Sequence, residues 1–600
     1  MQNHLTKKTT SWLLVGLTLL SFFFRFLSLG SVPVALSHDE TDNIIQAHAV
    51  IQTGSDINRT WNPWSLLPNS GVMAELGPLI NVPALSLLPQ SPFASRVTSA
   101  FLSSLFPLIL YFLLINLEIA NPVALTSAFL LSISPWHILF SRSALEQPTS
   151  LFFYVLSWLL LTLLFRSKKR LSFVLYALFF VLSYGIGFLT YHGYKFSLPI
   201  LTLLLTGFLT YSRRGRRAYG IALGVLLVIG SLFLHTYLHR DLYTSRSSEI
   251  IFSQGEKIAG IVNGERKQSL GTLQTKTIFS NKYSYLLGYL ENQYAGIFSP
   301  SLLFLTGEST GVFSTGETGY LLLMLAPFIL LGLLYLLRSK KGSAYLLVSL
   351  LLLSPITSVI QNNTTYSFRS ALFFVLLHVL AAAGLVGSYP WFKRLAWQIR
   401  WLLGTLLIVG FLSGVSYFTY VYFSIYPVTS ADAYTFGDRT LANYVRLSQG
   451  TGAKILIIDW QPRYIYSAII LAKGSVDAAA IASFGGHYSP SDDDIYQVDN
   501  LTVTHVCPKT GEYDTIIARW DIVAGLDNCP IAVSLMKRTP KPVIHSLASP
   551  LDSHEERRII SDTLCSDNEV KSYVHPTALA DFALEKMNKA QFCSTWVTKQ

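Results

Sequence analysis

Long apolar blocks constrain this chain more than any other feature of its sequence. The first block, residues 12–29, is almost wholly apolar, and similar blocks recur as far as residue 424. A block of roughly 18 or more apolar residues is long enough to cross the hydrocarbon core of a bilayer as one helix. Hydrophobic residues make up 51% of the 600 residues and charged residues only 13%, about half the charged fraction of a typical soluble domain. The sequence therefore predicts a polytopic (multi-pass) α-helical membrane protein.

The lengths of these blocks predict about eleven membrane spans. The expected spans are residues 12–29, 95–115, 122–140, 148–165, 171–190, 196–211, 218–236, 320–338, 343–361, 369–387 and 401–424. The first is too long for the apolar part of a cleavable signal peptide, and no small-residue cleavage site follows it. Residues 1–424 are thus expected to form one transmembrane domain with two large outer loops, 30–94 and 237–319.

Residues 425–600 are expected to form a separate α/β domain. Runs typical of buried strands occupy 454–459, 514–518 and 531–536, and a helix is expected near 464–472. All four cysteines of the chain lie in this part, at Cys507, Cys529, Cys565 and Cys593. An even number confined to one segment favours an oxidising compartment and up to two disulfides, with three connectivities open. Four unpaired buried thiols are the alternative.

The net charge of +11 indicates how the chain is oriented in the membrane. Basic residues cluster near the start of the chain and in short loops, at 7–8, 166–170, 213–217, 338–341 and 393–400. Lys and Arg in short loops mark the cytoplasmic side, and one orientation places all these clusters there. The N-terminus is then cytoplasmic, and the C-terminal domain is extracytoplasmic. The charge distribution also argues against a nucleic-acid partner, and the expected location is the plasma (inner) membrane of a bacterium.

Polar and ionisable side chains gather at the expected outer ends of the spans. They are His38, Asp39, Glu40, Glu75, Arg142, Glu146, Tyr191, His192, Lys195 and Arg369. Each has an ordinary explanation, because an acidic pair in a loop is commonly solvated and a long basic side chain can extend to the membrane interface. Their convergence on one face favours a functional site, since ionisable groups near a membrane are costly. The cytoplasmic loops contain almost no acidic residue beyond Glu118.

This arrangement resembles the C-type (GT-C) membrane glycosyltransferases, in particular the group of protein mannosyltransferases and aminoarabinose transferases. Those enzymes have an outer loop that opens with Asp-Glu after the first span, as at Asp39-Glu40. Residues 75–79, Glu-Leu-Gly-Pro-Leu, are similar to the family segment Glu-Lys-Pro-Pro-Leu, although leucine and glycine replace the lysine and the first proline. Arg142 followed by Glu146, and Arg369 at the start of a late span, match further family positions. The resemblance covers about residues 10–425.

The resemblance implies transfer of a hexosyl or pentosyl sugar from a polyprenyl-phosphate donor to a protein, lipid or glycan acceptor outside the cytoplasm. Transfer by a single displacement would invert the anomeric carbon. Asp39 is the expected general base, and Glu40 is expected to position it or to bind the sugar. Cationic side chains suit the phosphate leaving group, and the candidates are Arg142, Lys195 and Arg369. The other expected substrate-binding residues are His38, Glu75, Glu146, Tyr191 and His192.

No nucleotide is needed for this chemistry, because the carrier already stores the activation. No cofactor is assigned with certainty, and a divalent metal at the donor phosphate is compatible with the reaction. The C-terminal residues 425–600 contain no zinc-ligand spacing. Two other functions remain open. A transporter or flippase of a lipid-linked sugar would also gather charge at one face, but would be expected to contain repeats and charged or broken helices in the middle of the membrane. A non-catalytic scaffold that presents the C-terminal domain is the third hypothesis.

Overall fold

The computed structural model describes residues 7–69, 73–243, 248–309, 311–362, 365–474, 476–482, 484, 495–508, 510–519, 529–539, 542–550, 557–571, 576 and 578–599. The chain divides into two compact units. The helical unit comprises Met1–Leu27, Leu66–Gly77 and Ser99–Thr419, and the mixed unit comprises Ser28–Ser65, Pro78–Thr98 and Tyr420–Gln600. Segments of the first large loop thus belong to the same compact unit as the C-terminal residues.

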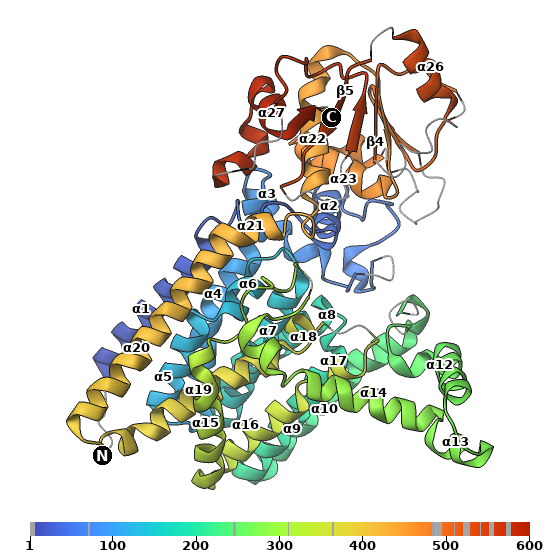
Figure 1. Cartoon of the computed structure of the whole chain (residues 1–600). Helices are drawn as coiled ribbons and strands as arrows, with labels where there is room; N and C mark the ends of the chain where they lie inside the picture. Colours follow the sequence, from blue (N-terminus) through green and yellow to red (C-terminus); the bar gives the residue numbers. More distant parts are fainter. Residues whose placement is uncertain are drawn as a thin grey trace. The chain divides into compact units, whose positions relative to one another are not determined.

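Helices, most of them long and apolar, make up most of the helical unit (Figure 1). They are α1 (Lys7–Phe26), α4 (Pro92–Asn116, whose first turns belong to the mixed unit), α5 (Asn121–Ser132), α6 (Pro135–Ser141), α7 (Glu146–Arg166), α8 (Arg170–Thr190), α9 (Tyr194–Arg213), α10 (Arg216–Leu238), α15 (Ala326–Ser339), α16 (Gly342–Leu353), α17 (Ile356–Val359), α18 (Tyr366–Arg369), α19 (Ala371–Phe392) and α20 (Trp397–Tyr420). Between α10 and α15 lie α12 (Gly255–Gln268), α13 (Leu273–Phe279) and α14 (Lys282–Gly296).

Nine of the described helices are long and apolar enough to cross a membrane, or ten if the bent pair α5–α6 counts as one span. The expected blocks coincide with helices, but two of them are not single long spans. The block at 122–140 is bent by 58° between α5 and α6, because Ser134 caps a new helix that has Pro135 in its first turn. The block at 320–338 forms one of the shorter apolar helices, Leu323–Ser339. The orientation of the spans stays a prediction.

Helices α15 and α19 approach each other closely through glycine. A Cβ added at Gly332 of α15 would lie 1.9 Å from the carbonyl oxygen of Leu380, and one at Gly384 of α19 would lie 1.9 Å from the carbonyl oxygen of Phe328. No side chain fits at either position, so the two backbones pack directly against each other. Such small-residue contacts are typical of helix packing inside a membrane.

The mixed unit contains a seven-stranded sheet in the order β2-β3-β1-β4-β6-β5-β7. The strands are β1 (Ile455–Ile458), β2 (Ile495–Val498), β3 (Leu501–Thr504), β4 (Thr515–Arg519), β5 (Ile544–Leu547), β6 (Arg557–Ile560) and β7 (Val597–Lys599). Strand β1 pairs in parallel with both β3 and β4, and the other pairs are antiparallel. The helices of this unit are α2 (His38–Thr53), α3 (Val82–Leu87), α21 (Tyr426–Thr429), α22 (Phe436–Ser448), α23 (Pro462–Ala472), α24 (Ala478–Ala482), α26 (Pro530–Arg538) and α27 (Lys589–Trp596).

The α/β character predicted for the C-terminal residues is confirmed, with one wrong element. The expected strands at 454–459 and 514–518 correspond to β1 and β4, and the expected helix at 464–472 corresponds to α23. The run 531–536, however, is part of helix α26. Pro530 favours the first turn of a helix, and Ile531 and Leu535 are spaced to bury one helical face.

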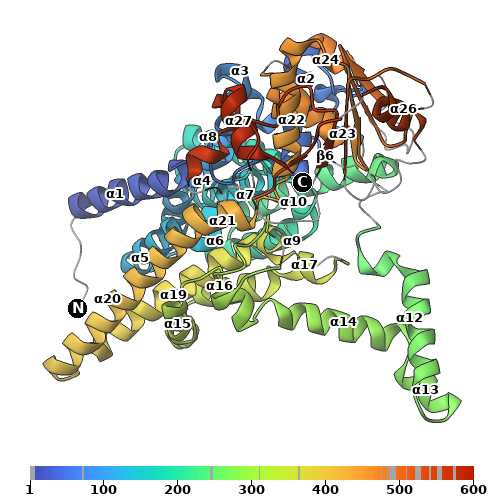
Figure 2. The ribbon, with the colours of Figure 1, turned by 45° about the horizontal axis from the view of Figure 1, so that its top comes forward.

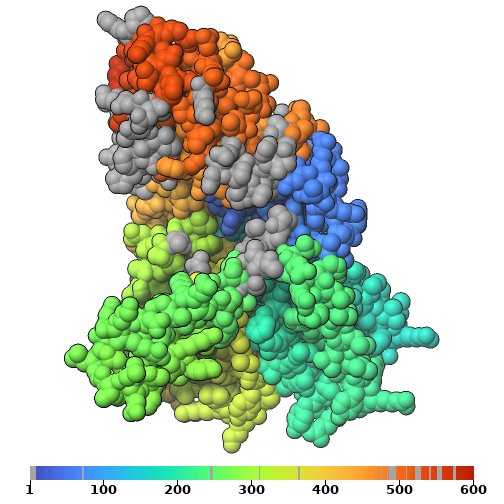
Figure 3. All heavy atoms as spheres, turned by 90° about the vertical axis from the view of Figure 1, so that its right-hand side faces the viewer, coloured from blue at the N-terminus to red at the C-terminus, as the bar shows by residue number. Residues whose placement is uncertain are grey.

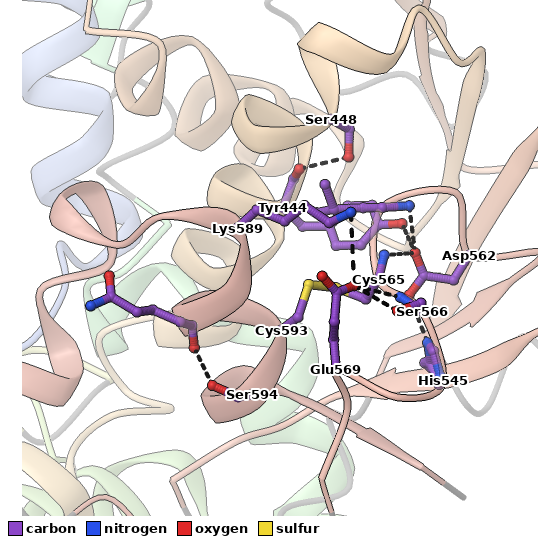
Figure 4. The surroundings of a disulfide bond; sticks show 12 residues. Tyr444, Ser448, His545, Asp562, Cys565, Ser566, Glu569, Lys589, Cys593 and Ser594 are labelled. Carbon is purple, nitrogen blue, oxygen red and sulfur yellow. Dashed lines mark hydrogen bonds and ion pairs between the residues drawn. A yellow bond between two sulfur atoms is a disulfide. The ribbon is translucent and has the colours of Figure 1, made fainter.

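The four cysteines form two disulfides, Cys507–Cys529 and Cys565–Cys593. Figure 4 shows the second bond beside a buried polar cluster. The Asp562 carboxylate accepts hydrogen bonds from the Tyr444 hydroxyl at 2.7 Å and from the Cys565 backbone N–H at 2.8 Å, and it lies 2.8 Å from His545 Nδ1. These contacts hold the Cys565 loop in place for the bond.

Thiol chemistry tests this pairing. Denatured, non-reduced protein should react with no maleimide, and reduced protein should react at four positions. In a Cys593→Ala variant, Cys565 alone should become reactive, and the free energy of unfolding of the mixed unit should fall by about 2–4 kcal/mol. Labelling of all four thiols before reduction would contradict the pairing.

Candidate functional site

The first turn of helix α2 holds the acidic pair that follows the first span. Ser37 caps this helix, and the Glu40 carboxylate accepts a hydrogen bond from the Ser37 backbone N–H at 2.9 Å, which completes a capping box. The same carboxylate pairs with Arg96 at 3.2 Å, and both side chains are fully buried. Arg96 also donates to the carbonyl oxygen of Pro33 at 2.9 Å. The turn is therefore fixed by a buried ion pair.

Asp39 lies on this fixed turn but is exposed. Within the part of the chain that the structure describes, its carboxylate accepts no hydrogen bond and forms no ion pair. The third acidic residue of the helix, Asp42, is instead paired with Arg463 at 2.6 Å. Asp39 is thus an exposed carboxyl group on a helical turn that a buried ion pair holds in place.

The His38 ring is also held in place. It stacks on the Tyr464 ring with centroids 3.9 Å apart, and its Nε2 lies 3.3 Å from the Asp438 carboxylate. Asp438 pairs in turn with Arg557 at 2.6 Å. Burial raises the pKa of Asp438, but the Arg557 charge and the hydrogen bonds from His38 and Arg557 outweigh this effect and leave the pKa below its usual value. His38 therefore faces a carboxylate that stays ionised.

In the helical unit, Glu75 lies at the centre of a second cluster of polar side chains. Its carboxylate oxygens lie 2.6 and 2.7 Å from the Lys195 ammonium, and the Tyr243 hydroxyl donates to the same carboxylate. The His192 ring meets the Tyr243 ring edge to face at a centroid distance of 5.6 Å. Burial, followed by the Glu75 charge, raises the pKa of Tyr243. Lys195 and Glu75 thus form a buried ion pair at the turn between α8 and α9.

The chain that follows Glu75 runs close to the start of α7. The Leu76 backbone N–H donates to the Leu189 carbonyl oxygen at 2.8 Å. A Cβ added at Gly77 would lie 3.1 Å from a carboxylate oxygen of Glu146. The glycine at this position therefore lets the segment pass Glu146, and the Glu75 segment and Glu146 lie side by side.

Arg369 ends the short helix α18 and pairs with Glu249 at 3.2 Å. Tyr191 lies beside it. Burial raises the pKa of Tyr191, while the Arg369 charge and a hydrogen bond to Gln147 oppose this effect. The expected residues Glu75, Glu146, Tyr191, His192, Lys195 and Arg369 thus all take part in neighbouring contacts of the helical unit.

Arg142 has a different environment. Its guanidinium donates to the carbonyl oxygens of Phe24 at 3.0 Å and of Arg25 at 2.9 Å, and the side chain is buried. These carbonyls belong to the C-terminal end of α1, where a cation stabilises the helix. These two contacts tie Arg142 to the end of α1, and its expected role at the donor phosphate stays a prediction.

Four residues of these clusters were missed in the sequence: Arg96, Tyr243, Glu249 and Glu308. Glu308 accepts hydrogen bonds from the Tyr366 and Ser367 backbone N–H groups and so holds the start of α18. Burial raises the pKa of Glu308. Glu249 and Glu308 lie in the second large loop, 237–319, away from the span ends, and their charge is the only signal of them in the sequence.

The described residues contain no group of three or more His, Cys, Asp or Glu side chains arranged to hold a metal ion. No residue is therefore assigned to a metal.

Comparisons with known proteins add the following findings. No family model matches the sequence, and no curated protein matches it. Among solved structures, ArnT from Cupriavidus metallidurans bound to undecaprenyl phosphate is 11% identical, with 92% of this chain and 98% of that chain covered and a TM-score of 0.48. The Archaeoglobus fulgidus oligosaccharyltransferase in the apo form is 13% identical over 78% of this chain, with a TM-score of 0.41, and this chain spans 64% of its length. The S. cerevisiae Pmt1-Pmt2 protein O-mannosyltransferase complex is 17% identical, with 40% and 35% covered and a TM-score of 0.31.

An oligosaccharyltransferase and a protein O-mannosyltransferase are thus among the solved structures that are similar to this chain. Because each TM-score is below 0.5, we draw no argument about function from them.

Proposed function

We propose that this protein is a membrane glycosyltransferase that moves a sugar from a polyprenyl-phosphate donor to an acceptor on the extracytoplasmic side. The observation that carries the proposal is the exposure of the Asp39 carboxylate. It lies on the first turn of α2, where the neighbouring acid, Glu40, is buried in an ion pair with Arg96. A transferase of this kind needs a rigidly held base that is open to its acceptor. Asp39 meets both conditions.

The proposed reaction is a single displacement. The acceptor oxygen or nitrogen forms a bond to the anomeric carbon of the sugar while Asp39 takes its proton. The bond between that carbon and the phosphate oxygen breaks, and its electron pair leaves with the polyprenyl phosphate. Because attack and departure occur on opposite faces, the anomeric configuration inverts. Either a hexosyl or a pentosyl group satisfies this chemistry.

Glu40 and His38 have supporting roles in this proposal. Both carboxylate oxygens of Glu40 are engaged by the helix cap and by Arg96, so Glu40 positions Asp39 and does not bind the sugar. His38 is held between Tyr464 and Asp438 and lies directly before Asp39 in the chain. Its ring is the candidate contact to a sugar or acceptor hydroxyl.

The residues proposed for the donor belong to the helical unit. The leaving phosphate requires fixed cations, and Lys195 and Arg369 supply them. Arg369 is the stronger candidate, because its planar guanidinium can bind two phosphate oxygens and its partner Glu249 is about one-third exposed. Tyr191, His192, Glu75 and Glu146 surround these cations and are the candidates for binding sugar hydroxyls. Arg142 is proposed to act only through the packing of α1.

The direct test is the release of free polyprenyl phosphate from a labelled donor. Purified protein in liposomes is supplied with sugars on undecaprenyl and dolichyl phosphates and with a panel of peptide, lipid and glycan acceptors. Acceptor-dependent release supports the proposal. Movement of intact donor across the bilayer without release would instead favour a transporter or flippase, and neither release nor movement would favour a scaffold.

Arg369→Ala should reduce the rate of transfer about 10²-fold, because it removes a fixed cation from the leaving group. Arg369→Lys keeps the charge but loses the planar fork, so it should recover part of that loss. Arg142→Gln is the matched control: it should lower the melting temperature and leave the turnover of the folded fraction unchanged. Equal turnover in Arg369→Ala and wild type would remove Arg369 from the proposed donor site.

A further inference from the structure

Helices α12, α13 and α14 form an arm with a small core of its own. Ile258 and Val262 of α12 pack with Leu286 of α14 and with Ile251, and no other fully buried side chain belongs to this described cluster. Thr272 caps α13, and Asn281 caps α14 with a complete capping box. Figures 1 and 2 show the three helices projecting from the membrane-spanning helices of the same unit. The arm is thus a folded element with little buried surface.

The far end of this arm exposes large apolar side chains. Their exposed fractions are 99% for Leu270, 78% for Leu273, 66% for Ile278, 74% for Phe279, 81% for Tyr283 and 68% for Leu287. Leu273, Ile278 and Phe279 point in different directions around α13, because they are spaced by five residues and by one. A group of large apolar side chains that are exposed together is normally covered by protein or by lipid. The green part of the surface in Figure 3 contains this arm.

The same end of the arm is basic. Between residues 264 and 283 the chain has four basic side chains, Arg266, Lys267, Lys276 and Lys282, against the single acidic side chain of Glu265. Lys267 and Lys282 are exposed. Lys276 and Arg266 also hold the end together, since the Lys276 ammonium donates to the Arg266 carbonyl oxygen at 3.0 Å. Exposed Leu, Ile and Phe beside Lys and Arg are typical of elements that lie in the interface of an anionic membrane.

The base of the arm is attached at the ends of membrane-spanning helices. The Tyr294 hydroxyl of α14 donates to the carbonyl oxygen of Leu352 at 3.0 Å, in the last turn of α16. The Tyr289 hydroxyl donates to the Gln361 carbonyl oxygen at 2.5 Å. Helices α16 and α17 together form the apolar span Gly342–Val359. Leu352 lies in the second half of this span and Gln361 lies just beyond its end, so the arm is attached along the last turns of the span.

We propose that the tip of this arm, residues 265–283, inserts into the headgroup region of the membrane and binds the phosphates of anionic phospholipids. The apolar side chains enter the upper acyl region, and the lysines remain at the level of the phosphates. An anionic bilayer surface satisfies both features of the tip, whereas an ordinary solvated loop leaves the apolar side chains in water. This inference is independent of the proposed glycosyltransfer.

Insertion of the tip can be tested with a fluorophore on one introduced cysteine. The four cysteines form two disulfides, and none of the described cysteines is free. A single introduced cysteine can therefore be labelled selectively. Full-length Leu273→Cys protein, carrying a polarity-sensitive fluorophore, is reconstituted in liposomes of phosphatidylcholine alone or mixed with phosphatidylglycerol. Glu512→Cys, whose side chain is 82% exposed in the mixed unit, is the control site.

The tip fluorophore should show a blue shift and be quenched by brominated lipids, more strongly when phosphatidylglycerol is present, and the control should show neither effect. The triple variant Lys267→Gln, Lys276→Gln, Lys282→Gln should lose the preference for phosphatidylglycerol, by at most about fivefold for each lysine. Inorganic phosphate should not change the spectrum. A tip signal like that of the control, a blue shift without lipid quenching, or equal quenching in both lipid mixtures would each overturn the proposal.

Discussion

Asp39→Asn should slow sugar transfer by about 10²–10⁴-fold, the usual effect of losing a positioned general base. The amide keeps the size of the carboxylate and much of its hydrogen bonding, but it cannot accept the acceptor proton. Because Asp39 is exposed and forms no ion pair with any described residue, the substitution should leave the melting temperature and the binding of donor nearly unchanged. The measurement is the acceptor-dependent release of polyprenyl phosphate under single-turnover conditions.

Two further variants separate a base from a binding group. In Asp39→Ala, added formate should restore part of the lost rate, because a small carboxylate can occupy the vacated space and accept the proton. Asp42→Asn is a control on the same helix, and its main effect should be on stability, since Asp42 pairs with Arg463. Wild-type release by Asp39→Asn would remove Asp39 as the base. A raised KM for donor with unchanged turnover would assign it to binding instead.

The sequence was sufficient to predict most of the apolar helices, because the thickness of a bilayer imposes a length on each apolar block. It also located the acidic pair and the cysteine-bearing domain. It failed where neighbouring contacts decide the outcome. The bend between α5 and α6 depends on the Ser134 cap, and the helix at 531–536 depends on its first-turn proline, Pro530. Both signals are local and were present in the sequence.

The partners of the site residues could not be predicted in the same way. Glu40 meets Arg96 across 56 positions, and Glu75 meets Lys195 across 120. Periodicity and hydropathy contain no information about such pairs, so Glu40 and Lys195 could be identified as ionisable but not as already paired. Arg142 illustrates the limit: its position near a span end identified it as a candidate cation, but its hydrogen bonds to the carbonyl oxygens of Phe24 and Arg25 in α1 could not be predicted.

The second large effect is expected on stability, from breaking the ion pair of Glu40 and Arg96. Both side chains are fully buried, so removing one partner leaves an uncompensated charge in the protein interior. Arg96→Met should therefore lower the free energy of unfolding by about 3–5 kcal/mol. The measurement is a thermal or denaturant unfolding curve of the purified protein in detergent.

The double variant Arg96→Met, Glu40→Gln removes both charges, so it should recover much of the stability lost in Arg96→Met, and a double-mutant cycle should give a large coupling energy. Equal losses of stability in the single and double variants would show that the buried charge is not the cause.

The effects on stability and on sugar transfer also distinguish the two acids of α2. If Glu40 acts by fixing the first turn of the helix, Glu40→Gln should lower stability and transfer together, and conditions that stabilise the fold should restore part of the transfer. Asp39→Asn should lower transfer alone, and no stabilising condition should restore it, because the missing function is proton acceptance and not the geometry of the turn.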